Sequence, residues 1–549
     1  MQTKTRTDRE SRPLTISHAT DRPDKAVVPD FFLKALAALL VSAAEAESLA
    51  GLVAGLMHGL RELGLAIILH TLESRDRALD TARGLRCPRR CGGLLRKTNK
   101  RKSRQRRTLL GLVEHKRRAW MCRRCSKPCF PLDEELGLLP GLRGHGTAFA
   151  NQVVLLCTLL PFERACWLFE QMRGFAVSTT LARALTVHVG TKMYEAETKR
   201  AKALWEQRET NPERFDPPPA VLRQTRRHDR VYVMADNSKL GLQEGPRGRG
   251  ASKGLSRRER RARKRALEAR RKKAAKAKKG RPGPKPVVAV PGDDPDIDSG
   301  FRDVRAVIVF RDEDRGETSH QRAAITRRRV LAHVGTYEEF KQFLHMVFHE
   351  EGVYTAREVV VVADGGNGIW EPIGELLPTT SARKVIEVLD WYHASSHLWV
   401  VGRALHGHDS AKKRARCTRW VRGKLDQLAE GRVANVIHGM SRMKNLKGTA
   451  AEEVRKCIGY FKKHQRRMRY AFFRDRGLLI GSGAIESVHG WVIQARCRQP
   501  GMRWSTTGAN AMLRLRCAWA SGRWEEEFSQ AAKQPPDGKA QPIEITAAA

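Results

Sequence analysis

The chain has 549 residues, of which 41% are hydrophobic, and a formal net charge of +44 at pH 7. This hydrophobic content excludes a wholly disordered protein, and the length predicts several domains. The excess of 103 Lys and Arg over 59 Asp and Glu predicts a polyanionic partner, of which nucleic acid is the commonest. A basic protein without such a partner, or one associated with the ribosome, is the plainer alternative.

The N-terminal part combines a polar tail with an apolar helical region. Residues 1–29 are polar and charged, and are predicted to form a disordered basic tail. From Phe31 to Leu72, apolar residues recur at helical spacing with few helix breakers. This pattern predicts two packed helices within an N-terminal helical region at 30–84.

One apolar run in this region resembles the core of a signal peptide. It extends from Phe31 to Ala44, but Lys34 interrupts it and a long segment with several acids precedes it. It is also shorter than the ~20 apolar residues that a membrane-spanning helix needs. We therefore interpret it as a core helix and expect no association with a membrane.

Eleven cysteines in a chain of this length do not indicate a disulfide scaffold. Four thiolates at zinc-knuckle spacing predict a structural Zn²⁺ site in a zinc-ribbon-like segment at 85–135, whose basic loop suits contact with DNA. Cys129 is an alternative ligand, and buried cysteines without a metal are the other interpretation. The two predicted knuckles are the pair Cys87 and Cys91 and the pair Cys122 and Cys125.

A helical pattern occupies residues 140–215, with a turn at 174–178. Ser178 is a typical N-cap, and a helix that begins there would expose Thr179 and Arg183 to a DNA major groove, as in a helix-turn-helix. Any two amphipathic helices joined at a glycine share this pattern. Packing within a helical domain is therefore the plainer interpretation.

Strand patterns begin at residue 229. The run from Asp229 to Asp236 predicts a buried strand that ends in a carboxylate. An insertion at 243–290 follows, in which residues 247–285 contain 19 Lys or Arg and two acids, a net +17. Such runs are usually solvated and disordered, and become ordered on a phosphate backbone if at all. We expect an accessory DNA contact or a disordered spacer.

The α/β pattern then resumes within a core region at 226–398. The apolar runs that end at Asp364 and Asp390 are nearly continuous, which is typical of central strands covered on both faces. The predicted strands are 304–310, 323–334, 358–364 and 384–390, and the predicted helices are 337–350 and 373–377. A helical insertion at 399–480, C-terminal core helices at 481–530 and a disordered tail at 531–549 complete the chain.

Two aspartates and one glutamate are candidate metal ligands. Strand ends converge at the ligand-binding edge of an open α/β sheet, which predicts that Asp236 and Asp364 lie close together. Glu486 follows the helix start Gly481-Ser482, where the helix dipole favours an ionised carboxylate. Such acids suit two Mg²⁺ or Mn²⁺ ions ~4 Å apart for phosphodiester chemistry. Taken singly, each acid is also explained as a helix cap, a turn residue or a first-turn charge.

A segment of cations and one indole follows Glu486. Arg496, Arg498 and Arg503 precede or adjoin Trp504, a combination that suits phosphate contact and base stacking near a processed DNA end. The alternative for Trp504 is a role as an anchor in the hydrophobic core.

Four blocks of sequence together resemble the DDE transposases of bacterial insertion sequences, closest to the ISKra and ISLre types. The resemblance extends over most of residues 85–525, and the last two blocks are the most specific. The blocks are residues 129–138 after the paired cysteines, Met234-Ala-Asp236, residues 363–365 with 389–398, and residues 481–487 with 501–505 and 508–509.

The resemblance implies a ribonuclease-H-like core in which Asp236, Asp364 and Glu486 are the catalytic acids that hold the metal ions. It also implies DNA partners (the terminal inverted repeats of a mobile element and its target), a homodimer or larger assembly, and a bacterial cytoplasmic, nucleoid-associated location. The stretch from Asp390 to His393 resembles the Asp-x-x-His motif of Mutator-like transposases, so these two residues are second candidates. We prefer Asp364 because it ends the fourth strand of the core.

We therefore predict a multidomain protein with an α/β ribonuclease-H-like catalytic core. Its mixed sheet carries a helical insertion, and helical and zinc-ribbon-like DNA-binding regions precede it. The predicted function is cleavage and transfer of DNA strands in transposition and recombination. The long basic insertion departs from the family's pattern. A metal-dependent nuclease that never joins DNA, and a non-catalytic regulator that binds nucleic acid, are the alternatives.

Overall fold

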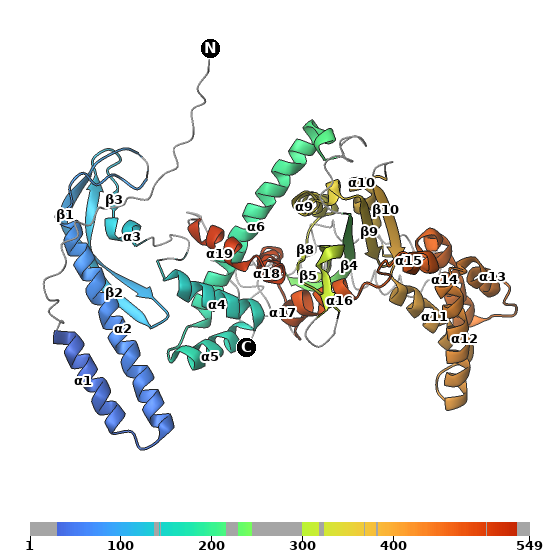
Figure 1. Ribbon diagram of the computed structural model, residues 1–549, viewed down its shortest axis with the longest axis horizontal. Coiled ribbons are helices and arrows are strands. Elements are labelled where there is room, and N and C mark those ends of the chain that lie inside the picture. The colour runs from blue at the N-terminus through green and yellow to red at the C-terminus, as the bar shows by residue number, and fades with distance from the viewer. Residues whose placement is uncertain are drawn as a thin grey trace, which may run out of the picture. The chain divides into compact units, whose positions relative to one another are not determined.

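The computed structural model describes residues 30–89, 91–136, 142, 144–215, 229–243, 299–317, 323–366, 368–379, 383–500 and 502–534. The chain divides into two compact units, residues 1–136 and 137–549, which we describe separately (Figure 1). Of the segments predicted to be disordered, residues 1–29, 244–290 and 535–549 lie outside the described residues. The predictions of disorder at residue 243 and at residues 531–533 are wrong, because residue 243 ends a strand and residues 531–533 belong to the last described helix.

The first unit consists of a helical hairpin and a small antiparallel sheet. Helices α1 (Asp30–Ala44) and α2 (Leu49–Leu79) pack against each other, as predicted from the apolar spacing. Among the described residues of this unit, the strands β1 (Leu95–Arg107), β2 (Leu112–Cys122) and β3 (Pro128–Cys129) form a sheet in that order, and α3 (Pro131–Glu135) follows.

The expectation that residues 31–44 form a core helix is wrong. Leu39 is buried, but Leu33, Leu36 and Leu40 of α1 are exposed. The physical reason is that α1 contacts only the neighbouring helix, so one side of it packs and the rest faces solvent. By length and composition alone, α2 is the one described helix that is long and apolar enough to cross a membrane.

The strongly basic strand β1 is stable because acids from outside the strand neutralise it. Its sequence places cations at successive positions on both faces, which by itself would oppose strand pairing. Buried or half-buried carboxylates at the end of α2 and in α3 accept charge-assisted hydrogen bonds from these strands. The pairs are Arg101 with Asp76, Arg118 with Asp80, and Arg106 and Arg117 with Asp133.

The second unit begins with three helices, α4 (Thr147–Leu159), α5 (Phe162–Arg173) and α6 (Thr179–Thr210). The predicted turn and cap are confirmed: Gly174 ends α5 with a left-handed backbone (φ 70°), and the Ser178 hydroxyl accepts a hydrogen bond from the Leu181 N–H. Helix α6 is long because most of its length packs against the helices that cover the central sheet.

That central sheet is mixed, as predicted. Among the described residues it contains five strands in the order β10-β9-β4-β5-β8. Strands β10, β9 and β4 are parallel, whereas β5 is antiparallel to both β4 and β8. The strands are β4 (Arg230–Gln243), β5 (Ser299–Arg311), β8 (Arg329–His333), β9 (Glu358–Ala363) and β10 (Lys384–Leu389), and β6 (Arg315–Glu317) pairs with β7 (Ala323–Ile325) separately.

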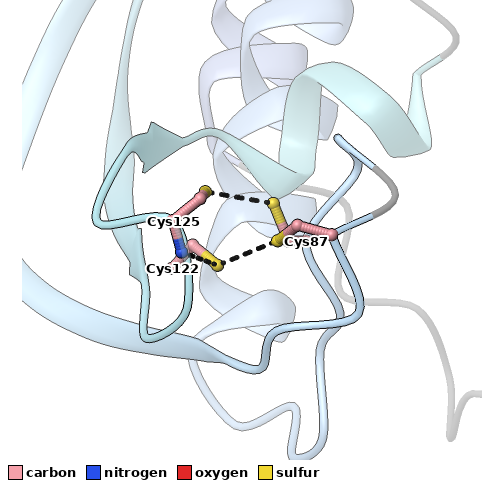
Figure 2. Close-up of side chains that lie close together, drawn as sticks. Cys87, Cys122 and Cys125 are labelled. Carbon is pink, nitrogen blue, oxygen red and sulfur yellow. Dashed lines mark hydrogen bonds between the residues drawn. The ribbon is translucent and has the colours of Figure 1, made fainter.

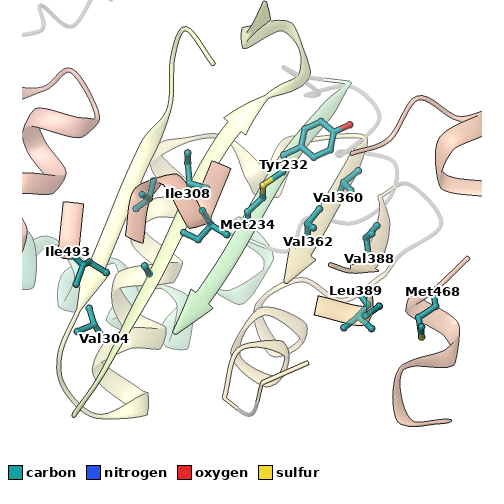
Figure 3. Close-up of a cluster of buried hydrophobic side chains, with 14 of the residues drawn as sticks. Tyr232, Met234, Val304, Ile308, Val360, Val362, Val388, Leu389, Met468 and Ile493 are labelled. Carbon is teal, nitrogen blue, oxygen red and sulfur yellow. The ribbon is translucent and has the colours of Figure 1, made fainter. Parts of the chain in front are cut away.

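Side chains alternate between two hydrophobic cores on the two faces of the sheet. Met234, Val362 and Val388 belong to the core drawn in Figure 3, whereas Val233 and Val361 belong to the core on the other face. Helices α9 (Tyr337–Glu350) and α10 (Trp370–Leu376) cover the latter face. The former is covered by α11 (Trp391–His406), α16 (Gly483–Val488) and α18 (Thr506–Ala520).

The predicted helical insertion forms α12 (Ala411–Ala429), α13 (Val433–Ser441), α14 (Gly448–His464) and α15 (Tyr470–Asp475). Its apolar side chains, among them Val421, Phe461 and Tyr470, extend the same core that α11 and α16 share. After α16 the helix widens into a π-helix (His489–Gln494) and then continues as α17 (Ala495–Cys497), before α18 and α19 (Trp524–Lys533).

Candidate active site and cysteine cluster

The sheet register places three aspartates at one level on neighbouring parallel strands. Ala235 of β4 pairs with Ala363 of β9, which pairs with Leu389 of β10. Asp236, Asp364 and Asp390 are the next residues of these three strands. Because neighbouring strands lie ~4.8 Å apart, the backbones of consecutive aspartates are close at this edge.

The prediction that Asp236 ends its strand is wrong. Strand β4 continues to Gln243, because the antiparallel β5 pairs with it as far as the match of Gln243 with Ser299. Strand β9, which pairs with the other edge of β4, does end here, and its last paired residue is Ala363. Asp236 therefore sits within a strand but at an open edge of the parallel part of the sheet.

The carboxylate of Asp236 lies in a crowded acidic environment. Its side chain is 20% exposed, and its Oδ1 accepts a hydrogen bond from the Asn237 N–H at 2.7 Å. Burial and the negative charges of Asp364 and Glu486 raise the pKa of Asp236 to about 6, and His393 opposes this shift. The charges of Asp364, Glu486 and His393 thus all act on Asp236, as expected for residues that lie near one another.

Asp364 is held by the loop that follows β9. Its Oδ1 accepts a hydrogen bond from the Gly366 N–H at 3.0 Å, and the Gly365 N–H donates to the Tyr460 hydroxyl at 3.1 Å. Both glycines are required by close approach: a Cβ atom on Gly366 would lie 2.8 Å from Asp364 Oδ1, and one on Gly365 would lie 2.2 Å from the Tyr460 ring. The side chain of Asp364 remains half-buried and accessible.

Asp390, the rival second acid, has a different environment. It is fully buried, and its two carboxylate oxygens accept hydrogen bonds from the Ser482 and His393 N–H groups, each at 2.8 Å. It caps α11 and ties that helix to the turn before α16. Because both oxygens are used and no surface is open, this carboxylate is a structural cap, and its neighbour Asp364 is the one that faces Asp236.

Glu486 approaches the aspartates from the helix α16. Its carboxylate is exposed, and its Oε1 accepts a hydrogen bond from the Ser482 hydroxyl at 3.3 Å. The π-helix that begins three residues later turns His489 toward the sheet, where its Nδ1 lies 3.6 Å from Asp236 Oδ2. Short π-helical segments occur frequently at functional sites. Burial lowers the pKa of His489 to about 4, so this imidazole is neutral at physiological pH.

A hollow of about 350 Å³ lies in front of Asp236 and Glu486. Its wall also carries two cations, Lys239 from the far part of β4 and Arg498 from the end of the C-terminal helical segment. The remaining lining residues are Asn237, Ser238, His489 and Gln494. An acidic floor beside two cations can hold divalent metal and a phosphate group at the same time.

The other residues that were predicted to contact DNA differ in how exposed they are. Arg503 is exposed and its guanidinium lies 4.9 Å from the Phe301 ring centre, and the Trp504 indole N–H donates to the Cys497 carbonyl at 2.9 Å. Trp504 is therefore partly an anchor, the alternative considered for it. Thr179 and Arg183 are half-buried, and Arg183 stacks over a phenylalanine ring.

The prediction that Arg496 contacts DNA is wrong. Its side chain is fully buried, its Nε donates to the Cys157 carbonyl at 2.9 Å, and its guanidinium lies 4.8 Å from the Phe162 ring centre. Burial lowers its pKa. This arginine holds the π-helical segment to the helices at the start of the second unit.

Sequence reasoning missed two site residues, Tyr460 and Lys239. Tyr460 comes from α14 in the inserted helices, 95 residues after the glycine that it contacts, and no local pattern marks it. Lys239 was missed because β4 was expected to stop at Asp236. The alternation of polar residues beyond Asp236 was the signal that could have found it.

The four predicted zinc ligands come together in the first unit. Their ligand atoms all lie within 4.8 Å of one another, which is a group that could hold a metal ion such as zinc. The Sγ atoms of Cys87 and Cys125 are 3.9 Å apart and those of Cys91 and Cys122 are 3.5 Å apart, close to the ~3.8 Å expected for a tetrahedron of Zn–S bonds. Figure 2 shows Cys87 opposite Cys122 and Cys125.

The backbone around Cys122 is shaped for a thiolate. The N–H groups of Arg124 and Cys125 each point at its Sγ at 3.4 Å, and they lower the pKa of this thiol to about 6. A Cβ atom on Gly93 would lie 2.6 Å from the same sulfur, so only glycine fits there. Cys129 Sγ lies 3.9 Å from that of Cys87, close enough to remain an alternative ligand.

In the described part of the chain, the four cysteines are the group of three or more His, Cys, Asp or Glu side chains whose ligand atoms lie within 4.8 Å of one another. The ligand atoms of Asp236, Asp364 and Glu486 do not meet this limit of 4.8 Å.

No protein-family model matches the chain, and a comparison with curated proteins finds no match.

Proposed function

We propose that this protein is a DNA transposase of the insertion-sequence type, which binds the ends of its element and catalyses metal-dependent cleavage and transfer of DNA strands. The observation that carries the proposal is the convergence of Asp236, Asp364 and Glu486 at one open edge of the sheet, beside Lys239 and Arg498.

The sheet supports a ribonuclease-H-like core for this proposal. The first three strands in the chain, β4, β5 and β8, pair antiparallel in succession, and the last two add parallel strands on the other side of β4. Such a core needs its acids on the first strand, after the fourth strand and on a C-terminal helix. Asp236, Asp364 and Glu486 occupy those three positions.

The donor set fits hard divalent cations. Burial and the negative charges of Asp364 and Glu486 raise the pKa of Asp236, and a divalent cation bound beside these carboxylates would relieve the repulsion. When bound, two Mg²⁺ or Mn²⁺ ions supply an activated oxygen nucleophile and stabilise the leaving oxygen. The wider spacing of the acids suits a pair of ions that keep some of their water ligands.

The chain's own residues have distinct tasks in this scheme. Asp236 and Asp364 would hold the metal from the sheet and Glu486 from the helix above it. Lys239 and Arg498 would bind phosphate oxygens of the DNA strand next to the acids. The neutral His489 orients the Asp236 carboxylate without adding a positive charge that would compete with metal.

The first unit would contribute to the recognition of DNA ends. A zinc ion held by the four cysteines would fix the base of the basic strands β1 and β2, which carry exposed lysines between their ion-paired arginines. In this scheme the partners are the terminal inverted repeats and the target DNA, the assembly on DNA is at least a dimer, and the protein acts on the nucleoid in a bacterial cytoplasm.

The test is a strand-transfer assay with labelled DNA that carries the sequences flanking the gene. The wild-type protein with Mg²⁺ or Mn²⁺ should cut one strand and join the freed 3′-hydroxyl to a target plasmid. Asp236→Asn, Asp364→Asn and Glu486→Gln should each lose at least ~100-fold of the rate, the order of loss expected for removal of one electrostatic group from a catalytic site. Glu338→Gln, an acid of α9 on the other face of the sheet, is the matched control.

Two outcomes would overturn the proposal. Cleavage without any joined product would make the protein a metal-dependent nuclease of similar architecture. Full activity of the acid variants in folded protein would leave a DNA- or RNA-binding regulator, for which charge neutralisation within residues 247–285 should then abolish function.

A further inference from the structure

The hairpin of α1 and α2 carries a row of aliphatic side chains that no described residue covers. Leu40 and Leu49 expose 61% and 76% of their surface, and the other members expose between 39% and 63%. Single exposed leucines are ordinary on a protein surface, but a long row of them marks an interaction site. We call this set the hairpin stripe; it consists of Leu33, Leu36 and Leu40 of α1 and Leu49, Val53, Met57, Leu60 and Ile67 of α2.

The two halves of the hairpin stripe face the same side. Within each helix its members recur at intervals of three, four or seven residues, which places them along one helix face. Leu39 and Gly59 mark where the helices touch, since a Cβ atom on Gly59 would lie 2.8 Å from Leu39. Successive residues of a helix are about 100° apart around its axis. On this basis the stripe residues of α1 lie about 90° around that helix from Leu39, and those of α2 lie about as far, in the same direction of rotation, from Gly59. Figure 1 shows that α1 and α2 run antiparallel. With this arrangement, the same rotational sense places the two halves on one side of the helix pair.

The size of this face is sufficient for a stable protein–protein contact. Eight aliphatic side chains that expose about half of their surface on average offer an apolar area on the order of 700 Å². A standard interface buries ~800 Å² on each partner. The heptad-like spacing is also the pattern with which helices interdigitate in four-helix bundles.

The low net charge around the hairpin stripe favours a protein partner over nucleic acid. Residues 33–60 contain one lysine and two glutamates, whereas the whole chain carries +44. A nearly neutral apolar face cannot attract nucleic acid. A second copy of this chain would be repelled by most of the basic surface, and this face is one on which two copies can meet without that repulsion.

Insertion into a membrane is disfavoured by the strands β1 and β2, which pack against α2 beside the hairpin stripe. A Cβ atom on Gly64 would lie 2.5 Å from Leu110 at the tip of the basic β1–β2 hairpin, so helix and strands pack tightly there. Near the end of α2, the buried Asp76 accepts a hydrogen bond from Arg101 of β1 at 2.5 Å. A membrane-spanning α2 would have to break these contacts or carry the charged strands into lipid.

We propose that the α1–α2 hairpin is a dimerisation module. Two copies of the chain pack their hairpin stripes face to face around a twofold axis and form an antiparallel four-helix bundle. Each member of the stripe then contacts the stripe of the other copy. This association needs neither DNA nor the acids of the second unit, so it stands apart from the proposed strand-transfer activity.

The test is the oligomeric state of the full-length protein by sedimentation velocity. Nuclease-treated protein at micromolar concentration and high ionic strength should sediment as a dimer. The double variant Met57→Lys with Leu60→Lys should dissociate, with a dimer Kd raised roughly a hundredfold or more, because four apolar contacts are replaced by buried charges. The matched control Ala54→Lys with His58→Lys adds the same charge to α2 about 130° around the helix from the middle of the stripe, and should remain dimeric.

The circular dichroism and melting of all three proteins should coincide, because the substituted residues are exposed and lysine is a good helix former. A monomeric wild type, or a dimer that the stripe variant does not dissociate, would overturn the proposal. Dissociation of the control would also overturn it. Co-sedimentation of monomeric wild type with phosphatidylcholine vesicles, lost in the stripe variant, would assign the stripe to a membrane instead.

Discussion

Asp236, Asp364 and Asp390 occupy one level of the sheet. They differ in how exposed their carboxylate oxygens are and in the hydrogen bonds that these oxygens accept. The carboxylates of Asp236 and Asp364 are partly accessible, and burial together with the charge of Asp364 raises the pKa of Asp236. The carboxylate of Asp390 is buried and accepts two backbone hydrogen bonds, one of them from Ser482, 92 residues later in the chain. The same residue type at the same level thus serves as a candidate metal ligand in two cases and as a helix cap in the third.

This contrast predicts losses of stability of different size. Asp390→Ala should lower the free energy of unfolding of the second unit by ~2–4 kcal/mol, because it removes a helix cap and leaves a buried N–H without a partner. Asp364→Ala should cost less than ~1 kcal/mol, because water replaces its hydrogen bond and a repulsion is relieved. Urea unfolding followed by fluorescence measures both; equal losses would contradict the distinction.

Glu197 of α6 is a second residue whose environment determines a testable property. It is fully buried, where it accepts hydrogen bonds from Arg514 of α18 and, at 2.6 Å, from Arg329 of β8. Burial alone would raise its pKa, but these two charges outweigh it and lower the pKa to about 2. The carboxylate therefore stays ionised in the folded protein and joins the first helices of the unit to the sheet.

The pH dependence of stability follows from the direction of this shift. Between pH ~4.5 and 2 the unfolded chain binds the proton and the folded chain does not, so stability present above pH ~4.5 is lost as the pH falls through this range. Glu197→Gln should cost ~3–5 kcal/mol at pH 7 and flatten the acid limb of the stability curve, because it leaves buried charges unpaired. Glu195→Gln, an exposed acid two residues earlier, is the control; an unchanged acid limb in Glu197→Gln would contradict the prediction.

At the scale of elements, the helical insertion takes part in the site. Helix α14 brings Tyr460 against the loop after β9, where its hydroxyl accepts the Gly365 N–H and its ring stacks on His397 with 4.0 Å between centroids. Burial and the nearby Asp364 carboxylate raise its pKa well above the usual value, so the hydroxyl keeps its proton. The insertion thereby fixes the position of the second acid.

Tyr460→Phe should therefore lower the rate of strand cleavage about tenfold, with little change in melting temperature, because one hydrogen bond worth ~1 kcal/mol positions the loop. Gly365→Ala should be more damaging, since its Cβ overlaps the tyrosine ring. Tyr392→Phe, which removes an exposed hydroxyl from α11, serves as the control. Single-turnover cleavage rates measure the effect, and a wild-type rate for Tyr460→Phe would exclude the positioning role.

The cysteine cluster is the element whose metal content is most easily measured. One equivalent of zinc per chain should be found by mass spectrometry, and Cys122→Ser should lose it together with protection of β1 and β2 against proteolysis, because structural zinc sites contribute directly to folding. Cys129→Ser should keep its zinc, since this residue stands outside the group of four. If Cys129→Ser lost its zinc and Cys91→Ser kept it, Cys129 and not Cys91 would be the fourth zinc ligand.

Local patterns predicted the elements well where local forces decide them. The helix at 337–350 has the predicted bounds because Thr336 and Glu339 form a reciprocal cap at its start and apolar residues line one face. The strand that ends before Asp364 lies where it was predicted because a run of four valines favours a strand that is covered on both faces. These features depend on residues within one turn or one strand, which a sequence displays directly.

The failures have a common physical origin in distant partners. Strand β4 is longer than predicted because β5, beyond the basic insertion, pairs with it to the end. Arg496 is buried because a carbonyl and an aromatic ring more than 300 residues earlier satisfy it. The core role expected of α1 fails because the unit is too small to cover it. For the site, the assignment of the three acids stays a prediction; the buried, capped environment of Asp390 depends on the packing of α16, which no local pattern shows.

At the scale of the whole molecule, a chain with a charge of +44 brings three acids near one another at one sheet edge. Other carboxylates, such as Asp133 in the first unit and Glu197 in the second, pair with arginine. Asp236 and Glu486 instead line a hollow with two cations, and the charge of Asp364 acts on Asp236. We propose that these acids and cations form a site for metal and polyanion together.

The most direct measurement of this claim is the mapping of the metal by Fe²⁺-dependent cleavage of the polypeptide. Fe²⁺ in place of Mg²⁺ generates hydroxyl radicals that cut the chain near its ligands. Cuts should occur next to Asp236, Asp364 and Glu486, disappear with excess Mg²⁺ and be lost in Asp236→Asn, while any cuts near the cysteine cluster persist because thiolates do not bind Mg²⁺. Absence of Mg²⁺-sensitive cuts at these three acids would contradict a shared metal site.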